Sequence, residues 1–222
     1  MTTDFERLGY LHLAGAMSCD ELSFGKNLFE RLAGRPGLRL HNRKEAGPLL
    51  AEQSSLVRAA SRLLQGTARP VRITLFDKEL QTNWGVGWHQ DRTVALAKRT
   101  DAIGFGPWTV KDGIPHAEPP VALLQEMITL RAHLDPVDRD NGALEVLPGS
   151  HREGRILKSK LEARANQADD VYRCFAAAGD LWAYRTLIVH RSAPSVTHRR
   201  RRVLQIDFAI GHPGEGLEWA VN

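Results

Sequence analysis

The chain has 222 residues, of which 42% are hydrophobic and 25% are charged, a composition typical of a globular domain with a sizeable core. No stretch approaches the roughly 18 apolar residues of a membrane span, and the N-terminus lacks a signal-peptide pattern. We therefore expect one cytoplasmic domain without a membrane partner. The net charge is +4, and the two cysteines, Cys19 and Cys174, are too few for a disulfide framework or a zinc knuckle.

Two helices are expected in the first third of the chain. Ser18 and Glu21 form a capping box at the start of the first helix, and the Gly-Arg-Pro-Gly stretch at 34–37 ends it. The second helix is predicted from Ser55 to Leu64, with Gly66 as its terminator. These helices form an N-terminal support that covers about residues 1–69.

Short strands separated by turn signals follow over about residues 70–211. Alternating apolar and polar positions predict an extended entry segment and five strands, at residues 5–13, 71–75, 125–134, 143–147, 181–189 and 203–210. In the strand 125–134, Thr129 and Arg131 share one face, and Ile128 and Leu130 share the other. The pattern predicts a mainly β sandwich or barrel with flanking helices, in a single domain over 1–222.

The first candidate functional residues are two side chains that can both bind a metal ion. His89 and Asp91 are two residues apart, and this spacing places both side chains on the same face of an extended strand. An imidazole and a carboxylate are two of the three ligands in the 2-His-1-carboxylate site of non-haem Fe(II) enzymes. The pair alone is weak evidence, because such spacings are common on protein surfaces.

A distal segment can complete the set of ligands. His190 ends an apolar run and supplies a second imidazole, since strands far apart in sequence are neighbours in a closed barrel. Arg201 follows after a turn, and its guanidinium suits bidentate capture of a carboxylate. Ser192 can add a hydroxyl to that carboxylate, and Arg199, which has the same strand parity as Arg201, is the reserve candidate.

These motifs, taken together, resemble the phytanoyl-CoA dioxygenase family. The resemblance spans roughly residues 70–210 and is carried by segments in the expected order, namely Trp88–Asp91, Asn141–Leu144 with Leu147–His151, Gly179–Leu181, and His190–Ser192 with Arg201. Members of this family are Fe(II)- and 2-oxoglutarate-dependent oxygenases on a double-stranded β-helix, a jelly-roll or cupin-like core. The resemblance therefore implies this fold and these two cofactors.

The roles of residues follow from the resemblance. It implies that His89, Asp91 and His190 bind iron and are catalytic, and that Arg201 binds the C5 carboxylate of 2-oxoglutarate. Ser192, Arg199 and Thr129 are further candidates for contact with the cosubstrate. The expected reaction uses O2 to hydroxylate an unactivated C–H of a small organic molecule, with release of succinate and CO2. Halogenases of this superfamily lack the carboxylate ligand, so the presence of Asp91 favours a hydroxylase.

The substrate is predicted only in outline. The segment 92–120 is expected to form a lid or pocket wall over the iron. Phe105, Trp108 and Lys111 in this segment, together with Arg131, are the candidate substrate-binding residues, and they suit a carbon skeleton with an anionic or polar end. The oligomeric state is left open.

Two alternatives compete with the oxygenase. A metal-binding cupin without oxygenase activity would keep the histidines but would not need the arginine. A nucleic-acid-binding protein would use the run 198–202, yet no aromatic residues for base stacking interleave it. A nucleic-acid demethylase of the same superfamily is the least favoured of these readings.

Overall fold

The computed structural model describes residues 2–32, 37–79, 83–197 and 199–221, and antiparallel sheets form its framework. The largest sheet has six strands in the order β1 (Tyr10–Leu13), β11 (Leu181–Arg185), β8 (Ile128–His133), β13 (Arg201–Ile210), β3 (Ala68–Lys78) and β2 (Gly37–Arg39). The second has the order β10 (Tyr172–Cys174), β9 (Leu144–Val146), β12 (His190–Ser192) and β4 (Val86–His89). The third has the order β5 (Val94–Ala95), β7 (Ile114–Ala117) and β6 (Trp108–Lys111).

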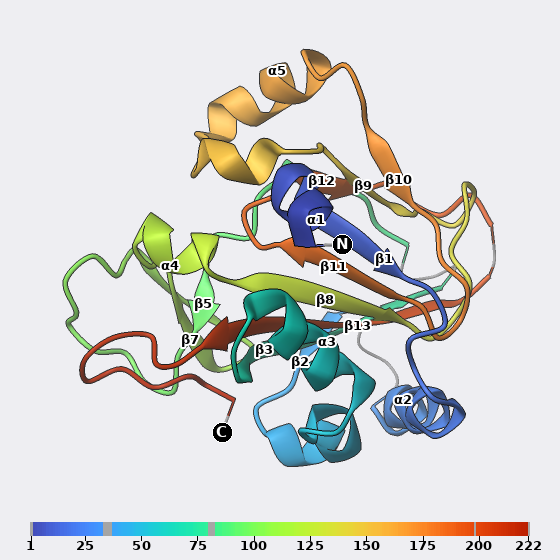
Figure 1. The fold of residues 1–222 in the computed structure, drawn as a ribbon, viewed down its shortest axis with the longest axis horizontal. Helices are drawn as coiled ribbons and strands as arrows, with labels where there is room; N and C mark the ends of the chain where they lie inside the picture. The colour runs from blue at the N-terminus through green and yellow to red at the C-terminus, as the bar shows by residue number, and fades with distance from the viewer. Residues whose placement is uncertain (1, 33–36, 80–82, 198, 222) are drawn as a thin grey trace.

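Helices flank these sheets. They are α1 (Thr2–Leu8), α2 (Cys19–Arg31), α3 (Ser55–Leu64), α4 (Val121–Gln125) and α5 (Leu161–Asn166), with 3-10 segments η1 (Arg43–Leu50), η3 (Ser150–Glu153) and η4 (Lys158–Lys160). In Figure 1, α2 and α3 lie beneath the six-stranded sheet, while β9, β10 and β12 lie above it. No helix within the described ranges is long and apolar enough to cross a bilayer.

The two helices expected from the sequence are confirmed. The Ser18 hydroxyl accepts a hydrogen bond from the Glu21 N–H at 3.2 Å, and the Glu21 carboxylate accepts one from the Ser18 N–H at 2.8 Å, so the capping box is complete. The helix α3 has the predicted bounds. Its terminator was predicted wrongly, because Gln65 and not Gly66 adopts the left-handed conformation, with φ of 57°. The predicted stop of the first helix at 34–37 lies mostly outside the described residues.

The largest differences from the predicted strands lie in the entry segment, before β8 and after β11. The first half of the entry segment is the helix α1, and only Tyr10–Leu13 pairs as a strand, with β11. Val121–Gln125 forms the short helix α4, so the following strand begins at Ile128. Tertiary pairing decided these limits: β11 stops at Arg185, where its pairing with β8 ends, although the apolar pattern continues to Val189.

The two faces of the six-stranded sheet have different partners. Leu130, Leu204 and Ile206 point into a core that they share with α2 and α3. The opposite face carries Trp182 and Tyr184, which pack with Leu144, Val146 and other residues of the four-stranded sheet. Two antiparallel sheets thus face each other, which confirms the expected mainly β jelly-roll core. Polar side chains on the inner face, at every second position of β3, β8 and β13, are enclosed between the sheets.

The segment that follows the ligand pair forms the third sheet. Its strand β5 begins three residues after Asp91, and β6 and β7 make a hairpin in which β7 pairs with β5. The C-terminal segment adds to this structure, since Trp219 bridges to Leu96. The residues expected to wall the pocket therefore belong to a hydrogen-bonded sheet with its own apolar cluster.

Candidate metal and cosubstrate site

The three candidate ligands meet at the edge between β4 and β12. His89 is the last residue of β4, His190 is the first residue of β12, and the two are paired across the strands. Their ring centroids are 4.1 Å apart, and Nε2 of His190 lies 3.9 Å from Oδ2 of Asp91. One ligand atom from each of the three residues lies within 4.8 Å of the others. Strand pairing thus joins residues that are about 100 positions apart in sequence.

Both histidines are oriented by backbone carbonyls. Nδ1 of His89 lies 2.8 Å from the Gly87 carbonyl oxygen, and Nδ1 of His190 lies 3.0 Å from that of Ile188. A carbonyl can only accept, so each Nδ1 carries the proton and each Nε2 presents a lone pair. Burial and the neighbouring His89 lower the pKa of His190 to about 3. His190 is therefore neutral at physiological pH, as a metal ligand must be.

Asp91 supplies the anionic ligand. Burial alone would raise its pKa, but the Arg72 guanidinium outweighs this and holds the pKa of Asp91 well below its usual range. Nη2 of Arg72 lies 3.1 Å from Oδ1, and Nε2 of Gln205 donates to Oδ2 at 3.4 Å. Two imidazoles and one carboxylate, without a fourth protein ligand among the described residues, fit Fe(II) with open positions.

Buried cations lie beside this triad. Arg201 is the first residue of β13, is 2% exposed, and is paired with Lys78, the last residue of β3. Lys78 donates to Ser192 Oγ at 3.3 Å and to the Trp84 carbonyl at 2.5 Å, while Arg201 donates to Ser192 Oγ at 3.5 Å and to the Gly142 carbonyl. Within the described ranges no ion pair joins Lys78 or Arg201 to a carboxylate.

Lys78 and Arg201 both contact Ser192, and no carboxylate among the described residues pairs with either of them. Burial, with Arg201 and Arg131 nearby, lowers the pKa of Lys78 to about 7, and burial with Arg131 lowers the pKa of Arg201. Arg131 is itself 6% exposed, and its guanidinium donates to Gln205 Oε1 at 2.7 Å. Buried cations without partners are costly, so this end of the site is suited to bind an anion.

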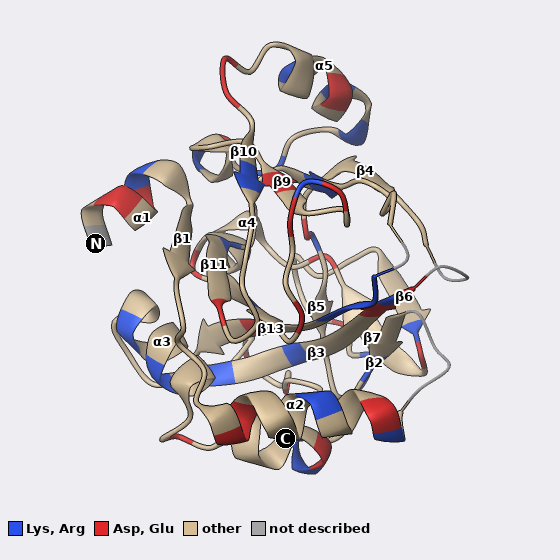
Figure 2. Ribbon diagram, turned by 90° about the vertical axis from the view of Figure 1, so that its right-hand side faces the viewer, with Lys and Arg blue, Asp and Glu red and all other residues tan. Residues whose placement is uncertain are grey.

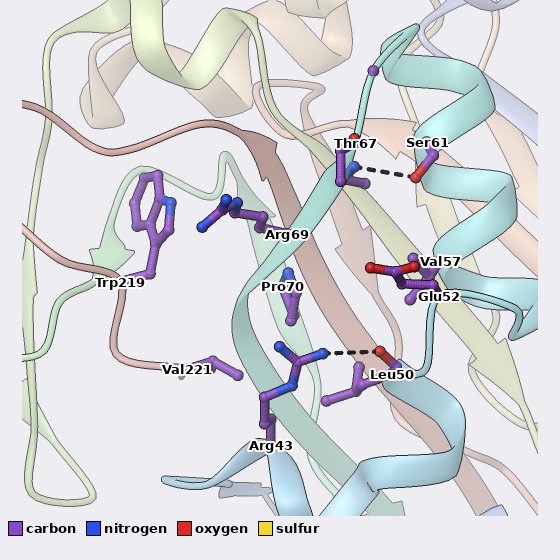
Figure 3. A pocket seen from close by; sticks show the side chains of 12 residues that line it. Arg43, Leu50, Glu52, Val57, Ser61, Thr67, Arg69, Pro70, Trp219 and Val221 are labelled. Atoms are coloured by element: carbon purple, nitrogen blue, oxygen red, sulfur yellow. Dashed lines mark hydrogen bonds between the residues drawn. The ribbon is translucent and has the colours of Figure 1, made fainter.

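The cations and the triad line one hollow of about 70 Å³. Its walls are Phe76, Lys78, Trp84, Val86, His89, Asp91, Arg131, Leu144, His190, Ser192, Arg201 and Gln205. A larger hollow of about 690 Å³ lies between η1, α3, the start of β3 and the C-terminal segment (Figure 3). It contains Arg43, Arg69 and Glu52 but no histidine or cysteine, so its described lining offers no comparable set of metal ligands.

The other cosubstrate candidates lie in different places. Ser192 contacts both Lys78 and Arg201, as described above. Thr129 is fully buried and donates to Asp207 Oδ1 at 3.1 Å. It is not among the residues that line the hollow. Arg199 lies outside the hollow, because its half-exposed side chain pairs with Asp138 at 2.7 Å.

The substrate candidates are also separated. Arg131 lines the hollow, and Lys111 reaches Thr93, two residues beyond Asp91, at 3.3 Å. Trp108 lies on the opposite face of β6 from Lys111, because the two are three positions apart in a strand. Phe105 and Trp108 pack against the apolar cluster of the third sheet.

The arginine run is neutralised within the chain. Arg200 pairs with Asp77 and with Glu30 of α2, and Arg202 pairs with Asp135 and with the same Glu30. Figure 2 shows α2 with acidic and basic segments next to each other. With Arg201 buried, the described part of the run is not a free basic surface for nucleic acid, and position 198 lies outside the described residues.

Sequence reasoning missed two buried cations, Arg72 and Lys78. Both lie on β3 with the parity opposite to the apolar positions Val71, Ile73 and Leu75. That alternation was visible, but the charged face was indistinguishable from a solvated one until the facing sheet was known.

The comparisons with known proteins agree with this geometry. The profile of the phytanoyl-CoA dioxygenase (PhyH) family matches residues 5–203. No curated protein gives a significant match. Among solved structures, AviO1 from Streptomyces viridochromogenes Tue57 is 22% identical, with a TM-score of 0.67 over 94% of this chain and 92% of its own.

Two further structures are informative. EctD from S. alaskensis, in a structure with 2-oxoglutarate and 5-hydroxyectoine, is 19% identical, with a TM-score of 0.67 over 94% of this chain and 74% of its own. SnoK, a non-haem α-ketoglutarate-dependent carbocyclase from nogalamycin biosynthesis, is 14% identical, with a TM-score of 0.67 over 97% and 86%. The family profile covers most of the chain, and the His-Asp-His site suits the iron and 2-oxoglutarate that such enzymes use. The chain therefore belongs to the phytanoyl-CoA dioxygenase (PhyH) family of 2-oxoglutarate-dependent non-haem iron oxygenases.

Proposed function

We propose that this enzyme hydroxylates an unactivated C–H of a small organic molecule. O2 supplies one oxygen atom to the product and one to succinate, and 2-oxoglutarate loses CO2. The observation that carries the proposal is Asp91, an ionised carboxylate that lies within reach of the His89 and His190 imidazoles. The third protein ligand that distinguishes hydroxylases from halogenases is thus available.

The chain's own residues would bind and orient the cosubstrate. His89, Asp91 and His190 would hold Fe(II), which with 2-oxoglutarate supplies the activation of O2. Arg201, Lys78 and Ser192 would receive the C5 carboxylate, since two buried cations and a hydroxyl converge there without an anionic partner. Arg131, held by Gln205, adds positive charge along the same wall. Burial of these groups strengthens their attraction for an anion, because little water screens it.

The substrate would approach along the segment that follows Asp91. Lys111 reaches Thr93 and is half-buried. Burial and the nearby Arg72 lower the pKa of Lys111. Lys111 and Arg131 remain our candidates for contact with a polar or anionic end of the substrate. The placement of Phe105 and Trp108 in an apolar cluster favours a structural contribution from both.

A cupin without oxygenase activity is the competing function. It would need the three metal ligands but no buried cations, so Arg201 and Lys78 without carboxylates argue against it. Titration with 2-oxoglutarate under anaerobic Fe(II) separates the two, because the cupin would show no affinity for the cosubstrate.

The test of the reaction is a panel of small organic molecules, scored by succinate release with Fe(II) and by the mass of the product. We expect succinate in equal amount to a product that has gained one oxygen atom. A product of unchanged mass would indicate epimerisation at this site instead of hydroxylation. A product that has lost two hydrogens would indicate cyclisation. Succinate release that does not depend on Fe(II) would contradict the proposal altogether.

A further inference from the structure

A buried arginine bridges the metal ligand to a second carboxylate. The Arg72 side chain is 6% exposed. Its Nη2 lies 3.1 Å from Oδ1 of Asp91, and its Nε lies 2.7 Å from Oδ2 of Asp207. Its remaining nitrogen, Nη1, donates to the Thr93 carbonyl at 3.4 Å. The guanidinium is therefore fixed from three sides, and only one of them is the ligand.

Asp207 is held as firmly as the arginine that it pairs with. It is 1% exposed, and Oδ1 accepts a hydrogen bond from Thr129 at 3.1 Å. Asp207 is paired with Arg72 on β3 and with Thr129 on β8, so the three residues are direct neighbours across adjacent strands. The row sits in the middle of the largest sheet, where backbone pairing on both sides resists movement.

The two oxygens of Asp91 consequently have different surroundings. Oδ1 faces the guanidinium of Arg72, whereas Oδ2 is the oxygen that lies 3.9 Å from Nε2 of His190. Oδ2 also accepts a long hydrogen bond from the neutral amide of Gln205 at 3.4 Å, so the charged partner is on Oδ1. A carboxylate whose second oxygen is engaged by a charge-assisted hydrogen bond is disfavoured as a two-oxygen ligand.

Whether Asp91 binds the metal through one oxygen or two decides how many positions stay open. An octahedral ion has six positions, and three protein atoms leave three open. 2-Oxoglutarate would occupy two of these, so one position would remain for O2. If Asp91 bound through both oxygens, that last position would be lost.

We propose that Arg72 is a positioning residue that restricts Asp91 to one-oxygen coordination of the metal, with Asp207 as its fixed counter-charge. The proposal concerns the metal site and rests on the proposed function only in assuming that this site holds Fe(II). The alternative is that Arg72 merely neutralises Asp207 in the interior. Arg72 is buried in either role. The two roles predict different metal affinities when Arg72 and Asp207 are replaced together.

The experiment compares Arg72→Gln, Asp207→Asn and the double variant. A glutamine is too short to reach both carboxylates. Arg72→Gln leaves the buried carboxylates of Asp91 and Asp207 without a cation, which lowers the melting temperature, whereas Asp207→Asn leaves Arg72 paired with Asp91. In the double variant only Asp91 lacks a cation, so part of the melting temperature recovers. Arg69→Gln, at an exposed position of the same strand, is the matched control.

Metal affinity gives the decisive reading. We expect Arg72→Gln to weaken binding of Fe(II) and of Co(II) by roughly 10- to 100-fold, the usual effect of losing a residue that orients a metal ligand. The double variant should keep this loss although part of its stability recovers, and its Co(II) absorption spectrum should differ from that of the wild type. If Arg72→Gln does not fold, the double variant still gives both readings.

Two results would overturn the proposal. One is a double variant with wild-type metal affinity and Co(II) spectrum, which would show that Arg72 only neutralises Asp207. The other is a wild-type protein that binds no metal at this site. By contrast, loss of metal affinity as predicted, combined with a product that gains no oxygen, would contradict the proposed hydroxylation and leave the role of Arg72 intact.

Discussion

Replacement of Asp91 by alanine is expected to abolish turnover while the protein still folds. The change removes one of the three ligands and the only anionic one, so we expect succinate release to fall by more than about 100-fold, beyond the loss typical of residues that merely orient ligands. The fold should persist, because Arg72 keeps its ion pair with Asp207 and no apolar core is removed. Succinate release and thermal melting, measured on the same preparation, check both parts.

Asp101→Ala is the matched control, since Asp101 is an exposed carboxylate in the segment that follows the site. It should leave both quantities unchanged. Normal turnover by Asp91→Ala would remove the residue from the metal site. Trace chlorination of the substrate by this variant in chloride would support the assignment, because the vacated position could then admit the halide.

The second large effect is expected at the other end of the hollow, for Arg201→Lys. A lysine keeps the charge but cannot reproduce the two parallel hydrogen bonds of a planar guanidinium to a carboxylate. One charge-assisted hydrogen bond contributes about 1.5–3 kcal/mol, so affinity for 2-oxoglutarate should fall about tenfold or more. Fe(II) affinity should change little, since the metal ligands are elsewhere. Anaerobic titration with the metal and then with 2-oxoglutarate measures the two separately.

Three neighbouring arginines provide controls for this measurement. Arg199 pairs with Asp138 on the surface, and such pairs contribute little to stability. Arg200 and Arg202 lie on the outer face with carboxylates of their own. Lysine at any of these positions should leave 2-oxoglutarate binding nearly unchanged. If Arg199→Lys lost much of its affinity for 2-oxoglutarate and Arg201→Lys lost none, the cosubstrate would be bound by Arg199 and not by Arg201.

Local signals predicted the parts of the fold that depend on local physics. The capping box at Ser18 and the apolar stripe of 55–64 specify helices through contacts between residues three or four positions apart. The alternation along 203–210 predicted a strand, and Leu204 and Ile206 of that strand do face the core. His89 and Asp91 were found through the same two-residue spacing, but the shared strand was predicted wrongly, because β4 ends at His89 and Asp91 follows it.

What could not be predicted depends on contacts between distant segments. Arg72 and Lys78 have charged side chains in a strand, a pattern that normally marks a solvated face, and only the facing sheet buries them. Phe105 and Trp108 were expected at the substrate, but the β6–β7 hairpin turns Trp108 toward an apolar cluster. The left-handed residue at the end of α3 is Gln65, although its neighbour Gly66 is the better intrinsic candidate.

The central claim is that one metal ion is bound by His89, Asp91 and His190 with 2-oxoglutarate beside it. The most direct measurement is an anomalous difference map, at the iron edge, from crystals grown anaerobically with Fe(II) and 2-oxoglutarate. Our account predicts a single strong peak within bonding distance of Nε2 of both histidines and of Oδ2 of Asp91, with the C5 carboxylate of 2-oxoglutarate against Arg201 and Lys78. A peak at any other set of residues, or fully occupied iron in crystals of the His89→Ala, His190→Ala variant, would contradict it.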